Sequence, residues 1–89
     1  MKRYIIRVSG RVQGVFYRAT TQEQANLLNI KGWIRNEADG SVLIEAEGST
    51  ASLHQLVEWC KEGPPSAQVS HVSVTEGSAI GYDNFTVRR

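Results

Sequence analysis

The order of strand and helix patterns constrains this sequence more than any other feature. Apolar and polar residues alternate over residues 4–12, which predicts a strand with one buried face. The segments 31–36 and 41–47 predict two more strands, and a turn at Asp39-Gly40 joins them, because an Asp-Gly pair tolerates the left-handed backbone of tight hairpins. A fourth strand and a short terminal strand are predicted from spaced apolar residues near the end of the chain: Val69, Val72, Val74, Phe85 and Val87.

Two segments between these strands have helical patterns. Residues 19–29 contain no Gly or Pro and place Ala25 and Leu28 three apart, which predicts a short helix. The second helix begins at Ser49 or Ser52, both good N-cap residues, and ends before Gly63-Pro64-Pro65. Its apolar residues follow the spacing i, i+3, i+4, i+7 on one face: Leu53, Leu56, Val57 and Cys60.

The predicted element order is β-α-β-β-α-β followed by a short fifth strand. Two helices on one face of a mostly antiparallel sheet make an α+β fold, the ferredoxin-like α/β sandwich. A chain of 89 residues can build only one core, so residues 1–89 are expected to form a single domain. In residues 41–47 one face is expected to be buried, with Glu45 and Glu47 on a solvated face.

Charge and cysteine content exclude several classes of function. Ten Lys and Arg against nine Asp and Glu give a net charge of +1, without the basic excess of proteins that bind nucleic acid or anionic membranes. The single cysteine, Cys60, excludes an intrachain disulfide and a zinc site built from several thiolates. The apolar run near the N-terminus stops after three residues, and no window has the length of a membrane span. We therefore expect a small soluble cytoplasmic protein.

The segment from Gly10 to Arg18 joins the first strand to the first helix and is the strongest candidate for a ligand site. A glycine-containing loop can direct successive backbone N–H groups into one concavity, next to the partial positive charge of a helix N-terminus. Arg18 is disfavoured there by the helix dipole unless an anion lies between the two, and its planar guanidinium suits phosphate oxygens. A plain connecting loop with a solvated arginine also fits these residues.

Asn36, at the end of the second predicted strand, is a second candidate. Its carboxamide has both an acceptor and donors, so it can hold and orient a water molecule without taking its proton. Asparagine is equally typical of residues that simply begin a turn.

Taken together, the two segments resemble the acylphosphatase family, whose first motif reads Gly-x-Val-Gln-Gly-Val-x-Phe-Arg. Here the loop from Gly10 to Arg18 departs from that motif only in Tyr17, which replaces Phe. The second family motif, Gly-x-Val-x-Asn-x-x-Asp-Gly-x-Val, is matched by residues 32–42 with Ile34 in place of Val. Residues 63–69 and 84–88 also resemble family features, so the resemblance extends over essentially the whole chain.

The resemblance implies hydrolysis of the carboxyl–phosphate bond of an acyl phosphate to a carboxylate and inorganic phosphate. Arg18 matches the family's phosphate-binding arginine, and Asn36 matches its water-positioning asparagine. The backbone of the loop would contact the phosphoryl oxygens through the segment Gln13-Gly14-Val15-Phe16-Tyr17-Arg18.

No metal, nucleotide or organic cofactor is expected. His54 and His71 fall outside any recognised triad or metal-ligand spacing, and they are interpreted as structural or surface residues, as Trp33 and Trp59 are interpreted as packing residues. The expected partner is a small-molecule acyl phosphate, with no nucleic acid or membrane, and the protein is expected to be a monomer.

Two other functions are alternatives to hydrolysis. The first is a non-catalytic ferredoxin-like module that binds phosphate or carboxylate ligands for regulation. The second is an RNA-binding α/β sandwich, but the chain lacks the aromatic RNP1 pattern and a basic face.

Overall fold

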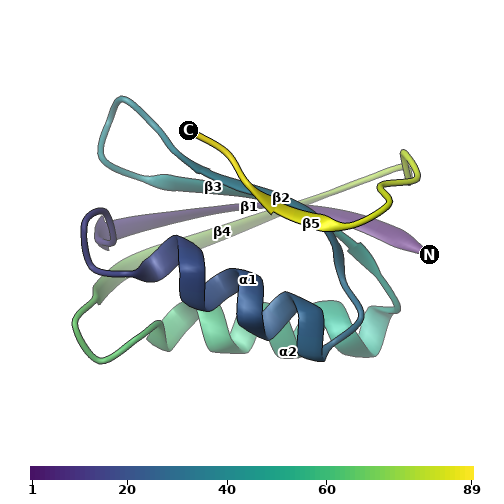
Figure 1. Cartoon of the computed structure of the whole chain (residues 1–89), viewed down its shortest axis with the longest axis horizontal. Coiled ribbons are helices and arrows are strands. Elements are labelled where there is room, and N and C mark those ends of the chain that lie inside the picture. Colours follow the sequence, from purple (N-terminus) through teal and green to yellow (C-terminus); the bar gives the residue numbers. More distant parts are fainter.

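The computed structural model describes all residues, 1–89, and contains seven elements. The sheet has the order β4-β1-β3-β2-β5, and both helices cover one of its faces (Figure 1). All neighbouring strands are antiparallel except β2 and β5, which are parallel. The predicted ferredoxin-like α/β sandwich is therefore confirmed. In chain order the elements are β1 (Lys2–Arg11), α1 (Tyr17–Leu27), β2 (Lys31–Asn36), β3 (Val42–Gly48), α2 (Thr50–Glu62), β4 (Gln68–Gly77) and β5 (Phe85–Val87).

One hydrophobic core lies between the sheet and the two helices. It contains the alternate residues Tyr4, Ile6 and Val8 of β1, as the period of two predicts. The opposite layer contributes Leu53 and Leu56 of α2, which are fully buried. Apolar burial of this kind supplies most of the free energy that holds a small domain together.

Helix α1 begins two residues earlier than predicted and ends two residues earlier. Its start at Tyr17 is favoured by tertiary packing, because the Tyr17 ring is buried and its hydroxyl donates to the carbonyl of Cys60 at 2.8 Å. At the other end Asn29 has a positive φ of 56°, and the N–H of Ile30 donates to the carbonyl of Ala25 at 2.8 Å. The positive φ of Asn29 and this hydrogen bond are features of a Schellman motif, which ends α1 two residues before the end of the predicted helix.

Of the two predicted caps of α2, the structure selects Ser49. The Ser49 hydroxyl accepts a hydrogen bond from the N–H of Ser52 at 3.1 Å, and Gly63 ends the helix with a φ of 69°. A Cβ atom at Gly63 would lie 2.7 Å from the Tyr17 ring, so this glycine also permits α2 to approach α1.

A β-bulge explains the irregular valine spacing in β4. Val69 pairs with Gly10 and His71 pairs with Ser9, which leaves Ser70 as the extra residue. Gly10 has a φ of 119°, and a Cβ there would lie 2.3 Å from the carbonyl oxygen of Gln68. The bulge therefore requires glycine where the chain leaves β1 for the candidate loop.

The expectation that Glu47 lies on a solvated face is wrong. Its side chain is 1% exposed, and its carboxylate accepts hydrogen bonds from the backbone N–H groups of Ile80, Gly81 and Tyr82. The reason is that the connection between β4 and β5 covers this part of the sheet. Burial raises the pKa of Glu47, but the three N–H donors outweigh it and hold the pKa below its usual value.

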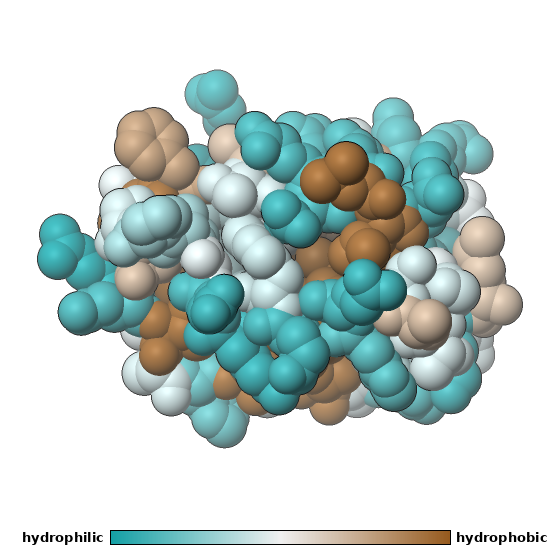
Figure 2. Space-filling model, turned by 90° about the horizontal axis from the view of Figure 1, so that it is seen from below, coloured by the Kyte–Doolittle hydropathy of each residue, from teal (hydrophilic) through white to brown (hydrophobic).

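The outer surface of the helical layer is mostly hydrophilic, with separate small apolar patches (Figure 2). Neither helix is long and apolar enough to cross a membrane.

Candidate active site

The connection between β1 and α1 forms a loop with two left-handed residues. Gly14 has a φ of 71°, and Phe16 has a φ of 64° although it carries a side chain. None of the backbone N–H groups of residues 13–16 donates a hydrogen bond within the chain. Left-handed residues in such loops allow neighbouring N–H groups to converge on an anion, so these donors are free to bind one.

The loop leads into the uncapped N-terminus of α1. Phe16 occupies the N-cap position without a side-chain hydrogen bond, and no acidic residue lies in the first turn. The first N–H groups of any helix lack partners within the helix, and they form the positive end of its dipole. In α1 no side chain caps these N–H groups and no acidic residue offsets the helix dipole, which favours binding of an anion at this end.

Arg18 lies in the first turn of α1 and extends toward the sheet. Its Nη1 donates to the backbone carbonyl of Arg88, just beyond β5, at 3.0 Å. This bond fixes one edge of the guanidinium and leaves the other donors available to a ligand. Because no acidic side chain pairs with Arg18, its charge is not neutralised by an ion pair.

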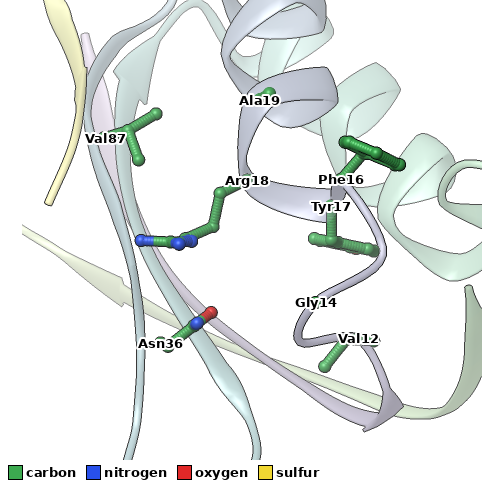
Figure 3. Close-up of a pocket in the computed structure, with 8 residues that line it drawn as sticks. All are labelled: Val12, Gly14, Phe16, Tyr17, Arg18, Ala19, Asn36 and Val87. Carbon is green, nitrogen blue, oxygen red and sulfur yellow. The ribbon is translucent and has the colours of Figure 1, made fainter. Parts of the chain in front are cut away.

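Asn36 is the last residue of β2, where it pairs with Val42 of β3. Its Oδ1 is buried and has no hydrogen-bond partner in the chain. A buried polar atom without a partner costs about 1–3 kcal/mol, so the orphaned oxygen marks a place where a water or ligand donor fits. Figure 3 shows the Asn36 carboxamide and the Arg18 guanidinium turned toward the same space.

Arg18 and Asn36 line one cavity of about 330 Å³, and Arg18 is its only charged lining residue. The structure thus brings both predicted catalytic residues together, although they come from different elements. Of the predicted loop residues, Gly14, Phe16 and Tyr17 also line the cavity. The remaining lining residues, which were not predicted as catalytic or substrate-binding residues, are Val12, Ala19 and Val87.

Two predicted loop residues, Gln13 and Val15, do not line the cavity. The Val15 side chain is buried in the core, and its carbonyl accepts a hydrogen bond from the Ser66 hydroxyl at 2.8 Å. The Gln13 amide turns toward the turn between β2 and β3 and donates to the carbonyls of Glu37 and Ser41 at 2.8 and 2.9 Å. For both residues, only the backbone remains available for the predicted contacts with phosphate.

The other titratable groups near the loop are unsuited to nucleophilic chemistry. Burial raises the pKa of the Cys60 thiol to about 12, and burial also raises the pKa of Tyr17 well above its usual value. His54 packs beside Tyr4, with ring centroids 6.2 Å apart, and does not line the cavity. No group of three or more His, Cys, Asp or Glu side chains is arranged to hold a metal ion.

Residues 84–88 resemble a family feature, but the contact of the Arg88 backbone with Arg18 was not predicted. The backbone oxygen of Arg88 holds Arg18, and the Arg88 guanidinium stacks on the Trp33 ring at 4.6 Å from the centroid. A backbone carbonyl is present in every residue, so no residue type could have indicated this contact. It depends on the parallel pairing of β5 with β2, which brings the end of the chain to α1.

Comparison with known proteins shows the family of the chain. The sequence profile of the acylphosphatase family matches residues 4–87. An acylphosphatase of Rubrobacter xylanophilus is 50% identical over 80 residues, which are 90% of this chain and 73% of that protein. An acylphosphatase of Salinibacter ruber is 47% identical over 89 residues, or 99% of this chain and 94% of that one.

Solved structures give the same result. The crystal structure of acylphosphatase from Bacillus subtilis superposes with a TM-score of 0.97 at 41% identity, and the match covers all of both chains. Full-length HypF, crystallised in a phosphate- and nucleotide-bound form, contains a similar segment with a TM-score of 0.87 and 26% identity, which covers 99% of this chain and 12% of HypF. The chain therefore belongs to the acylphosphatase family, hydrolases that act on acyl phosphates.

Proposed function

We propose that the phosphoryl group of an acyl phosphate binds between Arg18 and the backbone N–H groups of residues 13–18, and that Asn36 positions the attacking water. The reaction breaks the bond between the carboxyl oxygen and phosphorus, and it yields a carboxylate and inorganic phosphate. Arg18 contributes a fixed, permanently charged fork for the phosphoryl oxygens. The carboxamide oxygen of Asn36 accepts a hydrogen bond from the water and directs it toward phosphorus.

The leaving group explains why so few residues suffice. A carboxylate leaves without protonation, because the pKa of its conjugate acid is about 4. Phosphoryl transfer through a loose transition state depends mainly on positioning and on stabilising charge on the transferring oxygens. In this reaction a general acid or a metal ion is not required. An oxygen of the substrate itself can accept the proton of the water.

The observation that supports the proposal most is the shared cavity. It combines the one charged lining residue, Arg18, with the unpartnered oxygen of Asn36 and a loop whose N–H groups have no internal acceptor. Preorganised donors of this kind contribute about 10²–10³ each to the rate in comparable sites. A module that binds phosphate for regulation would use the same cation and N–H groups but would not need an aligned water.

Turnover separates these two functions. The chain should hydrolyse benzoyl phosphate far faster than the spontaneous reaction, and the rate should be unchanged in the presence of a chelator such as EDTA. A rate equal to the spontaneous one, together with intact binding of inorganic phosphate, would instead identify a binding module. Loss of activity in the chelator, restored by a divalent metal, would contradict the metal-independent mechanism.

A further inference from the structure

The side chain of Gln13 joins two parts of the active site that are otherwise separate. Its amide nitrogen uses both hydrogens, donating one to the carbonyl of Glu37 at 2.8 Å and the other to the carbonyl of Ser41 at 2.9 Å. Glu37 directly follows Asn36, and its own N–H donates to the Ser41 carbonyl at 2.8 Å. The Gln13 amide therefore closes the base of the β2–β3 turn, where the chain leaves β2 directly after Asn36.

These are the only hydrogen bonds between residues 12–16 and the β2–β3 hairpin. The other polar contacts of the loop run to the segment between α2 and β4 and to α1. The Ser66 hydroxyl donates to the Val15 carbonyl, and the Thr20 hydroxyl donates to the Phe16 carbonyl, both at 2.8 Å. Without Gln13, this loop and the turn that follows Asn36 would have no hydrogen bond between them.

We infer that Gln13 is a positioning residue that fixes the distance between the phosphate-binding loop and Asn36. This inference rests on the proposed function, in which the loop binds phosphate and Asn36 positions the water. It assigns no contact between the Gln13 side chain and the substrate. Phosphate binding requires Arg18 and the loop, whereas attack on phosphorus requires the loop and Asn36 in one fixed arrangement. Misplacement of reacting groups by about 1 Å can cost up to about 10²-fold in rate. Loss of the Gln13 amide should therefore impair the chemical step much more than phosphate binding.

The test is a double-mutant cycle between Gln13 and Asn36, with kcat for benzoyl phosphate and the inhibition constant of inorganic phosphate as readouts. Gln13→Met keeps the length of the side chain but removes both donors. It should lower kcat about tenfold and change the phosphate inhibition constant less than twofold. In a chain that already carries Asn36→Ala, the same substitution should lower kcat less than twofold, because there is no carboxamide left to misplace.

A matched control removes a similar bond elsewhere. The Gln22 amide donates to the carbonyl of Phe85 at 3.0 Å, away from the β2–β3 turn. Gln22→Met should reduce stability by an amount comparable to Gln13→Met but should leave kcat within about twofold of the unchanged chain. If Gln13→Met lowered kcat equally with and without Asn36, or weakened phosphate inhibition as much as it lowered kcat, the inference would be overturned.

A binding experiment keeps the inference separate from the proposed function. Inorganic phosphate added to the unchanged chain should shift the side-chain amide resonances of Asn36 in a ¹H–¹⁵N NMR spectrum. In Gln13→Met, phosphate should bind with similar affinity while this shift is reduced or broadened. Absence of turnover in the unchanged chain would refute the hydrolytic function alone, whereas an unaltered Asn36 shift in Gln13→Met would refute the positioning role.

Discussion

Arg18 occupies a position where its charge would be unfavourable without a ligand. It lies in the first turn of α1, next to the positive end of the helix dipole, and it has no acidic partner. Its guanidinium is instead held by the carbonyl of Arg88 and faces the cavity. A bound oxyanion would resolve this arrangement, because it interacts favourably with both the guanidinium and the helix end.

Arg18→Ala should lower kcat/KM by about 10²–10³ and remove measurable inhibition by phosphate, because it deletes the only charged group that lines the cavity. Steady-state kinetics with benzoyl phosphate and inorganic phosphate measure both effects. Arg18→Lys should recover little, since a point charge cannot replace the planar fork. The control is Arg11→Ala, which removes an exposed arginine outside the cavity and should leave both constants within about twofold. Unchanged phosphate inhibition in Arg18→Ala would contradict the assignment.

Asn36 is expected to act in the attack of water on phosphorus, whereas Arg18 is expected to act in phosphate binding. Asn36→Ala should lower kcat by about 10²-fold while it changes the phosphate inhibition constant less than about threefold, because the carboxamide orients water and does not carry the anion's charge. The same two kinetic measurements provide the test. Equal losses in kcat and in phosphate affinity would show instead that Asn36 is a phosphate ligand.

At the scale of elements, the β4–β5 connection is held by Glu47 rather than by apolar packing alone. Glu47→Gln should lower the free energy of unfolding at pH 7 by about 2 kcal/mol, because it removes the charge from a buried acceptor of three N–H donors. Urea unfolding of both chains between pH 7 and pH 3 measures the difference.

The pH dependence of that difference follows from the lowered pKa of folded Glu47. Unfolded glutamate has a pKa of about 4.3, so the charged carboxylate contributes its full stability above that pH. The contribution disappears as the pH falls through the lower pKa of the folded state. Glu76→Gln, which removes a carboxyl whose side chain is 59% exposed, should change stability by less than about 0.5 kcal/mol. A stability difference between the unchanged chain and the Glu47→Gln variant that stayed constant down to pH 3 would refute this account.

The elements themselves could be predicted from periodicity, but several of their details could not. Alternation and helical spacing place six elements within about two residues of their observed positions, because one face of each is buried, whereas β4 extends to Gly77, three residues beyond the last predicted residue, Val74, and has no fully buried residue. The start of α1 depends on the burial of Tyr17 against α2, and the bulge at Ser70 depends on the pairing of β4 with β1. Glu47 looked like an ordinary outward residue, since only the path of residues 78–84 decides that it is covered.

In the whole molecule, the fold assembles the candidate site from three separate segments of the chain, the first of which runs from the loop after β1 into α1. The loop after β1, the start of α1, the end of β2 and the end of β5 all contribute lining residues to one cavity (Figure 3). Arg18 and Asn36 could be predicted as site residues from the sequence because two motifs contain them, and both line the cavity. The backbone contact of Arg88 and the side-chain bridge of Gln13 could not, because each depends on which strands become neighbours in the sheet.

A crystal structure of the protein with bound phosphate would show whether Arg18, the loop and Asn36 act on one phosphoryl group. We expect one phosphate in the cavity, with its oxygens within hydrogen-bond distance of the Arg18 guanidinium and of N–H groups in the loop that precedes α1. A water held by Asn36 should face the phosphorus atom. Phosphate bound elsewhere, or bound to Arg18 with Asn36 too distant to share one water with it, would contradict the account.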